Sequence, residues 1–211
     1  MKENEPTNLL KGYNMMLYFA GSMIMYEPTE ECITDFWTNG ALRRLPVSSS
    51  NPRFMKAASL LRESCTDKDI CRQLLQDDYL RLFDDSGFHL ASAHASHYLS
   101  DTNNDDVTYN EVGEFYKSYG WDSRSRIKRA NDHLGTELLF LTSLVDRYLL
   151  LDDNASSDIM KSDIQRFITR HMLSWIPEWN ERIQEHASTP GYKGIGILIL
   201  ACIEDLYSIF S

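Results

Sequence analysis

Few residues of the chain have the types and spacing that catalysis requires. Asp132 and His133 are neighbours, and an acid beside an imidazole could supply a general base and the group that orients it. Adjacent residues at a helix start point in different directions, so we expect Asp132 instead to cap the helix that begins there. The sequence has no Gly-rich phosphate loop and no G-x-S-x-G motif. These residues therefore favour a binding protein over an enzyme.

A second group with possible chemistry is the histidine set His89, His94 and His97. On a loop, the spacing H-x4-H-x2-H could bind a transition metal. No Cys stands nearby, however, no helical phase relates the three, and the sequence has no H-E-x-x-H motif. We therefore predict no metal and no cofactor, and a metal-binding protein remains an alternative.

The cysteines and the apolar runs bear on the compartment. Cys32, Cys65, Cys71 and Cys202 are scattered, and a separation of six between Cys65 and Cys71 is not a zinc-site spacing. We expect all four to be reduced thiols of a cytoplasmic protein. The N-terminus lacks a basic stretch followed by an apolar one, so no secretory signal is predicted. The most apolar runs, 13–26 and 195–203, are too short to span a membrane.

The chain is strongly acidic. Its 31 Asp and Glu against 21 Lys and Arg give a net charge of −10, which argues against nucleic acid or an anionic membrane as a partner. Most of this charge lies between Asp77 and Glu114, where nine acids accompany one base, Arg81. Such a run is either a set of solvated helix faces or a negative potential that attracts a basic segment of a partner.

The elements that must position these residues are helices. Apolar residues recur at helical spacing and predict an all-α protein of about eight helices in a single domain, 1–211. The helical stripes fall at 9–24, 33–37, 54–61, 70–83, 109–119, 132–151, 157–185 and 190–210. A looser stretch at 84–107 is predicted to be the hinge loop that joins two halves.

Local signals predict several helix ends. Asn39-Gly40 should stop the second helix, and Asp67 should cap the fourth. Pro177 should kink or split the pattern at 157–185, while Thr189-Pro190 should start the last helix. Gly191, Gly194 and Gly196 are explained by tight packing of that helix. Trp175 and Trp179 are assigned to the core.

Three stretches of the sequence resemble one known family. They are YLRLF (79–83) followed by SHYL (96–99), FYKSYGW (115–121) followed by NDHLGTELLF (131–140), and HMLSWIP (171–177) followed by ASTPGY (187–192). In this order and spacing they resemble the TorD/DmsD/NarJ family of molybdoenzyme-maturation chaperones, over about residues 75 to 205.

The resemblance implies an all-helical cytoplasmic chaperone that is not an enzyme. Such proteins bind the twin-arginine leader or N-terminal segment of a molybdopterin-containing anaerobic oxidoreductase, hold the apoenzyme during cofactor insertion, and delay export until then. The implied partner is the apo catalytic subunit with its leader peptide, and the chaperone is a monomer or a domain-swapped homodimer. Motif matching places the peptide-binding region at Tyr79, Leu82, Phe83, His94, Ser96, Tyr98, Asp132 and His133.

The physical properties of these residues suit a basic, apolar peptide. We expect Leu82, Phe83 and Tyr98 to line a groove, with core packing as the alternative for Leu82 and Phe83. Asp132 is expected to hold an arginine, and His133 to sense pH or to hydrogen-bond across the hinge.

The sequence departs from the family pattern at two places, which keeps other functions open. AHAS at 93–96 stands where many members have Pro-Trp-Gly-Ser, so an imidazole replaces the aromatic wall, and Ala130-Asn131 replaces the proline common before Asp-His. One alternative is therefore a chaperone of the same fold for a cytosolic metalloenzyme without a twin-arginine leader. A less favoured alternative is a nucleotide-binding switch that uses the region of Asp132 and His133.

Overall fold

The described part of the protein is built from helices. The computed structural model describes residues 4–35, 45–65, 67–83, 90–99, 105–122 and 130–211, and every regular element within these ranges is helical. The predicted all-α fold is confirmed. None of the described helices combines the length and the apolar character needed to cross a membrane.

The chain order of the elements follows the predicted stripes closely. The elements are α1 (Asn4–Met25), α2 (Glu30–Ile33), α3 (Pro52–Glu63), α4 (Lys68–Phe83), α5 (Ser96–Leu99), α6 (Asp105–Ser118), α7 (Leu134–Tyr148), α8 (Asn154–Phe167), a π-helical turn η3 (Ile168–Met172), α9 (Ile176–His186) and α10 (Pro190–Phe210). The range predicted for the hinge loop, 84–107, is longer than the loop itself. It includes the one-turn helix α5 and the start of α6. The predicted stop at Asn39-Gly40 lies outside the described residues.

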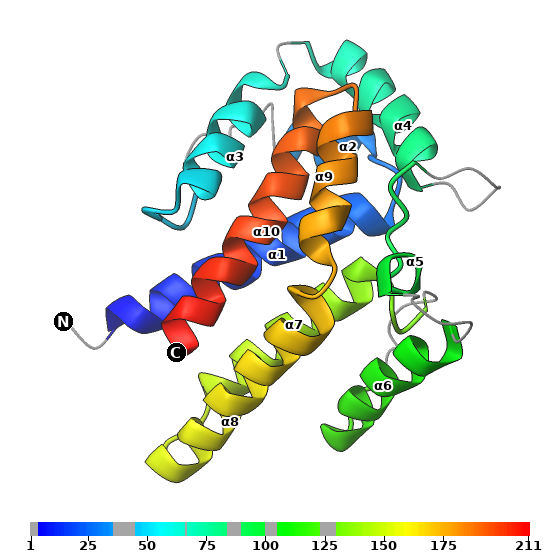
Figure 1. Cartoon of the computed structure of the whole chain (residues 1–211). Coiled ribbons are helices and arrows are strands. Elements are labelled where there is room, and N and C mark those ends of the chain that lie inside the picture. The colour runs from blue at the N-terminus through cyan, green and yellow to red at the C-terminus, as the bar shows by residue number, and fades with distance from the viewer. Residues whose placement is uncertain (1–3, 36–44, 66, 84–89, 100–104, 123–129) are drawn as a thin grey trace.

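Helices α1 and α10 run antiparallel through the middle of the molecule (Figure 1). The Tyr192 hydroxyl donates to the Met23 carbonyl at 3.1 Å, and the Tyr13 hydroxyl donates to the Asp205 carboxylate at 2.7 Å. Helix α10 also carries α3 and α9 on its flanks. Helix α10, at the end of the chain, therefore packs against helices that precede the hinge loop. One hydrophobic core contains residues from both sides of that loop.

The predicted tight packing of the α10 glycines is confirmed. A Cβ at Gly194 would lie 2.8 Å from Leu61 Cγ, and one at Gly196 would lie 2.9 Å from Asn180 Oδ1. Contacts this short leave no room for a side chain. The glycines therefore let α3 and α9 approach the α10 backbone closely.

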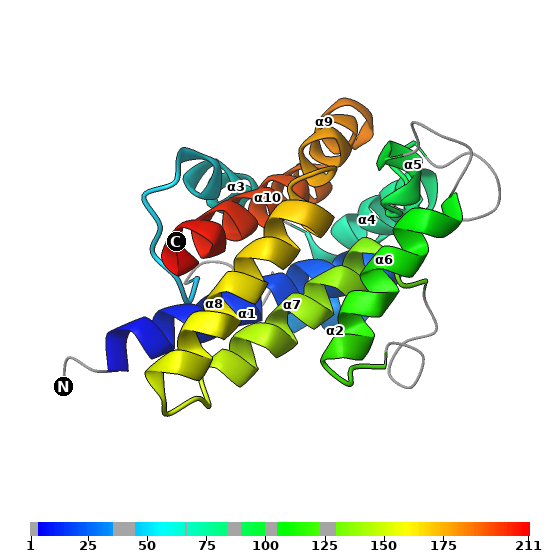
Figure 2. The same cartoon turned by 60° about the horizontal axis from the view of Figure 1, so that its bottom comes forward.

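Helices α6, α7 and α8 lie side by side, with α7 packed against α1 and α8 also against α10 (Figure 2). Aromatic rings join them: Tyr116 of α6 lies 4.6 Å from Phe140 of α7, which lies 5.0 Å from Phe167 of α8. Gly120 follows α6 with φ +61°, a conformation that favours glycine, and Trp121 returns to within 4.8 Å of the Tyr116 ring. This aromatic cluster fixes α7, the helix that carries the candidate site.

The predicted break at Pro177 is present. Helix α8 passes through η3, the chain turns, and α9 begins with Pro177 in its first turn. Proline fits there because the first helical amides have no partner within the helix. Trp175 and Trp179 at this turn are almost fully buried, as predicted.

The caps predicted for α4 and α10 are confirmed. Asp67 Oδ1 accepts from the amides of Asp69 and Ile70 at 3.0 and 3.2 Å. Thr189 Oγ1 accepts from the Tyr192 amide at 3.2 Å. In each case one side chain satisfies amide groups that the first turn leaves without a partner.

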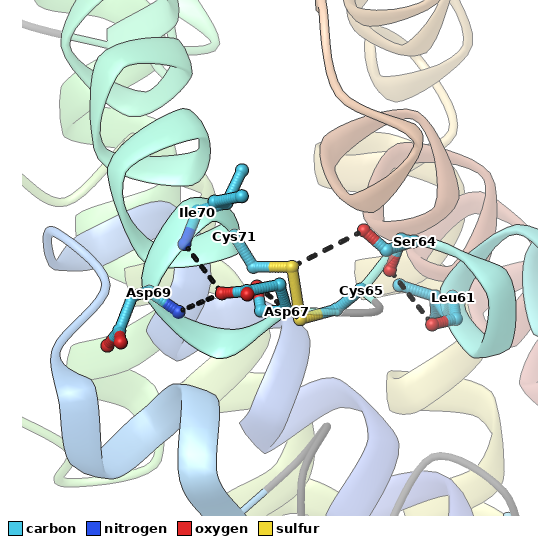
Figure 3. Close-up of a disulfide and its surroundings, with 7 residues drawn as sticks. All are labelled: Leu61, Ser64, Cys65, Asp67, Asp69, Ile70 and Cys71. Carbon is cyan, nitrogen blue, oxygen red and sulfur yellow. Dashed lines mark hydrogen bonds between the residues drawn. A yellow bond between two sulfur atoms is a disulfide. The ribbon is translucent and has the colours of Figure 1, made fainter.

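The expectation of four reduced cysteines is wrong for two of them. Cys65, just after α3, and Cys71, in α4, form a disulfide, while Cys202 is a buried free thiol (Figure 3). Helix α3 ends at Glu63 and α4 begins at Lys68, so the short turn between them brings the two Cα atoms to 5.6 Å. The separation of six residues argued against a zinc site but did not predict this cross-link.

Candidate functional site

The described part of the hinge loop is tied to the start of α7 by backbone hydrogen bonds. The Ala95 amide donates to the Asp132 carbonyl at 3.0 Å, and the Leu134 amide donates to the Ala93 carbonyl at 2.7 Å. These bonds form an isolated bridge between His94 and His133. Residues separated by more than 30 positions in sequence thus meet at one point.

Asp132 is at the centre of this meeting point. It is 4% exposed, and its carboxylate accepts from the Ser96 hydroxyl at 2.7 Å and lies 3.3 Å from His94 Nδ1. Burial favours a higher pKa for Asp132. Hydrogen bonds from His94 and Ser96, with the charge of His94, outweigh burial and hold the pKa of Asp132 below its usual range. The carboxylate is therefore ionised at neutral pH.

His133, rather than Asp132, caps α7. His133 Nδ1 accepts from the Gly135 amide at 3.1 Å, so the predicted Asp132 cap is wrong. The physical reason is that the Asp132 side chain turns to the hinge loop, where Ser96 and His94 bind it. An Nδ1 that accepts an amide proton is itself unprotonated. The ring of His94 packs edge-on against that of His133, with centroids 5.1 Å apart.

Tyr98 lies on the same loop and reaches the C-terminal part of the chain. Its hydroxyl donates to the Ser92 carbonyl at 2.9 Å, and its ring stacks on Trp175 with centroids 5.3 Å apart. The Arg182 guanidinium of α9 lies 5.3 Å from the ring centroid, which is a cation–π contact. Burial raises the pKa of Tyr98, so the phenol stays neutral.

The three remaining predicted residues lie in the core beneath the loop. Leu82 has no exposed surface, and the Phe83 ring packs between those of Tyr79 and Tyr192, each with centroids 5.5 Å away. The Tyr79 hydroxyl donates to the Met25 carbonyl at 3.2 Å. Core packing, rather than the wall of an open groove, therefore describes Leu82 and Phe83.

The structure thus brings five of the eight predicted residues together: His94, Ser96, Tyr98, Asp132 and His133. We call these five the hinge cluster. The hinge loop is also connected to the three core residues, because the Ala91 amide at the start of the loop donates to the Leu82 carbonyl at 3.2 Å.

Sequence reasoning missed one acid next to the hinge cluster. Glu137 is 1% exposed and, within the described part of the chain, its Oε2 has no hydrogen-bond partner. Burial raises the pKa of Glu137 well above its usual range, and the negative charge of Asp132 raises it further. Its position one turn after His133, on the same helix face as Leu134, Leu138 and Leu141, was the available signal.

The three histidines do not assemble into a metal site among the described residues. His94 and His97 have ring centroids 6.4 Å apart, and His89 lies outside the described residues. No group of three His, Cys, Asp or Glu side chains with the geometry to hold a metal ion is found in the ranges that the structure describes.

The acidic run contains at least one residue that is not a surface charge. Asp78 is 1% exposed and accepts from the Thr189 amide, the Thr189 hydroxyl and the Arg81 guanidinium at 2.8, 2.7 and 2.9 Å. It therefore fastens α4 to the turn before α10. Glu111 and Glu114 are exposed and pair with Arg170 and Lys117. Asp84, Asp85 and Asp101 lie outside the described residues.

The described elements are all helical, and the hinge loop is bound to the start of α7. Comparison of the sequence with known proteins identifies the family to which such a chain belongs. Residues 50–181 match the model of the nitrate reductase delta subunit family, so the chain belongs to that family. The predicted membership of the TorD/DmsD/NarJ group is confirmed.

Three curated relatives are similar to this chain. They are the chlorate reductase assembly chaperone protein of Ideonella dechloratans, the chaperone protein TorD of Psychrobacter sp. (strain PRwf-1) and the selenate reductase assembly chaperone protein of Thauera selenatis. Their identities are 24%, 27% and 25%, over 64%, 62% and 59% of this chain and 70%, 59% and 65% of their own lengths. All three relatives are named as chaperone proteins.

Proposed function

We propose that this protein is a cytoplasmic assembly chaperone for a molybdopterin-containing anaerobic oxidoreductase. It binds the twin-arginine leader or N-terminal segment of the apo catalytic subunit, assists cofactor insertion, and delays export until the cofactor is in place. The hinge cluster receives the peptide, and the charge of Asp132 is available there to attract an arginine.

The observation that supports this proposal most directly is the ionised, buried Asp132 within the hinge cluster of a chain from this family. The carboxylate of Asp132 accepts a hydrogen bond from the Ser96 hydroxyl and lies within hydrogen-bond distance of the His94 imidazole, and these contacts favour its negatively charged form despite burial. Two of the three relatives are named as assembly chaperones of reductases, which supports a reductase client for this chain as well.

The test begins with capture of the client. The tagged full-length chain is isolated from anaerobically grown cells of its own source, and the captured proteins are identified by mass spectrometry. A molybdopterin oxidoreductase subunit with a twin-arginine leader supports the proposal. A metalloenzyme without such a leader supports the alternative of a chaperone for a client that is not exported. Capture of neither rejects both.

Calorimetric titration then tests the site. The synthetic leader of the captured subunit is added to the wild type and to Asp132→Asn, at low and at high salt. Loss of the charge should weaken binding about tenfold or more, as expected for a charge-assisted hydrogen bond of about 1.5 to 3 kcal/mol. Asp152→Asn, at an exposed loop position, is the matched control. Equal affinities of the wild type and Asp132→Asn would remove Asp132 from the site.

A further inference from the structure

A groove between α1 and α7 is a feature that the hinge cluster does not explain. We call it the α1/α7 groove; its volume is about 470 Å³, within the range of roughly 300 to 1,000 Å³ typical of ligand-binding pockets. Leu17 and Met25 of α1 and Leu138 and Leu139 of α7 contribute apolar walls. The groove is thus of a size and character to receive apolar side chains of a partner.

The rim of the groove exposes large side chains that an isolated protein would normally bury. Tyr18 and Tyr26 line the groove and are 62% and 54% exposed, and Met15, one turn before Tyr18, is 61% exposed. Tyrosine combines a large apolar ring with a polar hydroxyl. It therefore suits a surface that contacts water when the partner is absent and is covered when the partner binds. The exposed face of α1 thereby extends the apolar surface of the groove.

A glycine gives the groove its depth. Gly21 lines it, and a Cβ at this position would lie 3.5 Å from Leu138 Cδ1, which is an ordinary contact. Packing therefore does not require glycine here, unlike at Gly194 and Gly196. The absence of a side chain instead leaves space between the two helices.

The groove carries one charge, and it is negative. Asp146 is the one charged residue among those that line it, and no Lys or Arg within the described ranges pairs with it. Asn14, which is 9% exposed, fixes its position: the Asn14 amide nitrogen donates to Asp146 Oδ1 at 2.7 Å and to the Thr142 carbonyl at 3.1 Å. A neutral amide positions the carboxylate without cancelling its charge. A basic side chain is therefore the complementary group.

Buried residues link the groove to the hinge cluster. Met25 lines the groove and also contacts the position of Gly135, whose amide is bound by the His133 side chain. From there, Leu138, Thr142 and Asp146 follow along successive turns of α7. The groove therefore runs along α7 from near the end that carries the hinge cluster.

We propose that the α1/α7 groove is a second docking site of the chaperone, for an apolar segment of the client that carries a basic side chain facing Asp146. This inference rests on the proposed function and adds the place where the apolar part of the bound segment lies. The hinge cluster and the groove together would recognise the basic and the apolar residues of one peptide.

The test uses a fluorescein-labelled synthetic peptide with an arginine pair followed by leucines and alanines, and a second peptide with glutamines in place of the arginines. Ser143→Trp fills the groove from α7 and should weaken binding of both peptides roughly tenfold or more. Asp146→Asn keeps an acceptor for Asn14 and should weaken the arginine peptide alone, by roughly two- to fivefold. Ser59→Trp on the exposed face of α3 and Asp152→Asn are matched controls that should change neither affinity.

Cross-linking locates the peptide independently of affinity. Benzoylphenylalanine at position 18 should capture the arginine peptide, and the same group at the exposed position 159 of α8 should not. Unchanged affinity of Ser143→Trp, or absence of the position-18 cross-link, overturns the groove proposal. If the client is captured and Asp132→Asn still weakens its leader, the proposed function survives that result. Failure to capture any such client rejects the proposed function itself.

Discussion

The hydroxyl of Ser96 donates a hydrogen bond of 2.7 Å to the carboxylate of Asp132, a residue 36 positions further along the chain. Ser96 opens α5 in the hinge loop, and Asp132 stands just before α7. The bond therefore fixes the loop against the helix by a side chain, next to the two backbone bonds that do the same. After His94, Ser96 is the second hydrogen-bond partner that lowers the pKa of Asp132.

Ser96→Ala should lower the free energy of unfolding by about 1 to 3 kcal/mol, because it leaves a buried carboxylate short of a donor. Urea unfolding followed by circular dichroism measures the loss. Ser118→Ala is the matched control, since its exposed hydroxyl donates only to the Phe115 carbonyl. It should change stability by less than about 0.5 kcal/mol. Equal losses for the two variants would contradict the assigned role of Ser96.

Glu137 should make the protein less stable as the pH rises. Its pKa in the folded protein lies well above the ordinary value that it has in the unfolded chain. Between these two values the folded protein binds the extra proton, so stability falls as the pH increases through this range. Glu137→Gln has no side chain that titrates, so it does not lose stability in this way. The melting temperature of Glu137→Gln minus that of the wild type should therefore increase from about pH 5 to about pH 8. Glu114→Gln, at an exposed position of α6, should show no such trend. A flat difference for Glu137→Gln would show that Glu137 titrates normally.

The disulfide predicts a response to reductant. Linking Cys65 to Cys71 restricts the unfolded chain, and a loop of this length should contribute about 2 kcal/mol to stability. A dithiol reductant should lower the melting temperature of the wild type but not of Cys65→Ser, and reduction should raise the intact mass by two hydrogen atoms. Identical melting curves with and without reductant would show that the cross-link does not stabilise the fold.

Two glycine substitutions should have opposite effects. Gly194→Ala places a methyl group 2.8 Å from Leu61 Cγ and should destabilise the protein by about 1 to 3 kcal/mol. Gly21→Ala meets Leu138 at an ordinary 3.5 Å, so helix propensity decides the outcome and should raise stability by up to about 1 kcal/mol. Chemical unfolding of both variants measures the difference. A loss at Gly21 as large as that at Gly194 would contradict this packing.

The sequence predicted those parts of the fold whose cause is local. Asp67 and Thr189 are capping residues directly before helical patterns, and Pro177 interrupts one, so each marks its boundary whatever the tertiary structure. The family resemblance located the hinge cluster because its motifs contain those residues.

Features that depend on distant partners were not predictable in the same way. Asp132 has the sequence context of a cap, and only the approach of Ser96 and His94 from the loop turns its side chain away. Asp78 lies in an acidic run that suggests solvent, yet it is buried against Thr189, 111 positions away. The Cys65–Cys71 disulfide depends on how closely α4 follows α3, which no periodicity reports.

The position of α10 has a consequence for biosynthesis. This helix is translated after α1, α3, α8 and α9, all of which it packs against, and the apolar face of α3 has α10 as its main partner. At roughly 5 to 20 residues per second, the ribosome needs on the order of 10 to 30 s to proceed from the end of α1 to the start of α10. During that interval the nascent chain displays unpaired apolar surface. The chain thus passes through an incompletely packed stage of its own, and cotranslational holding by a general ribosome-associated factor would benefit its yield.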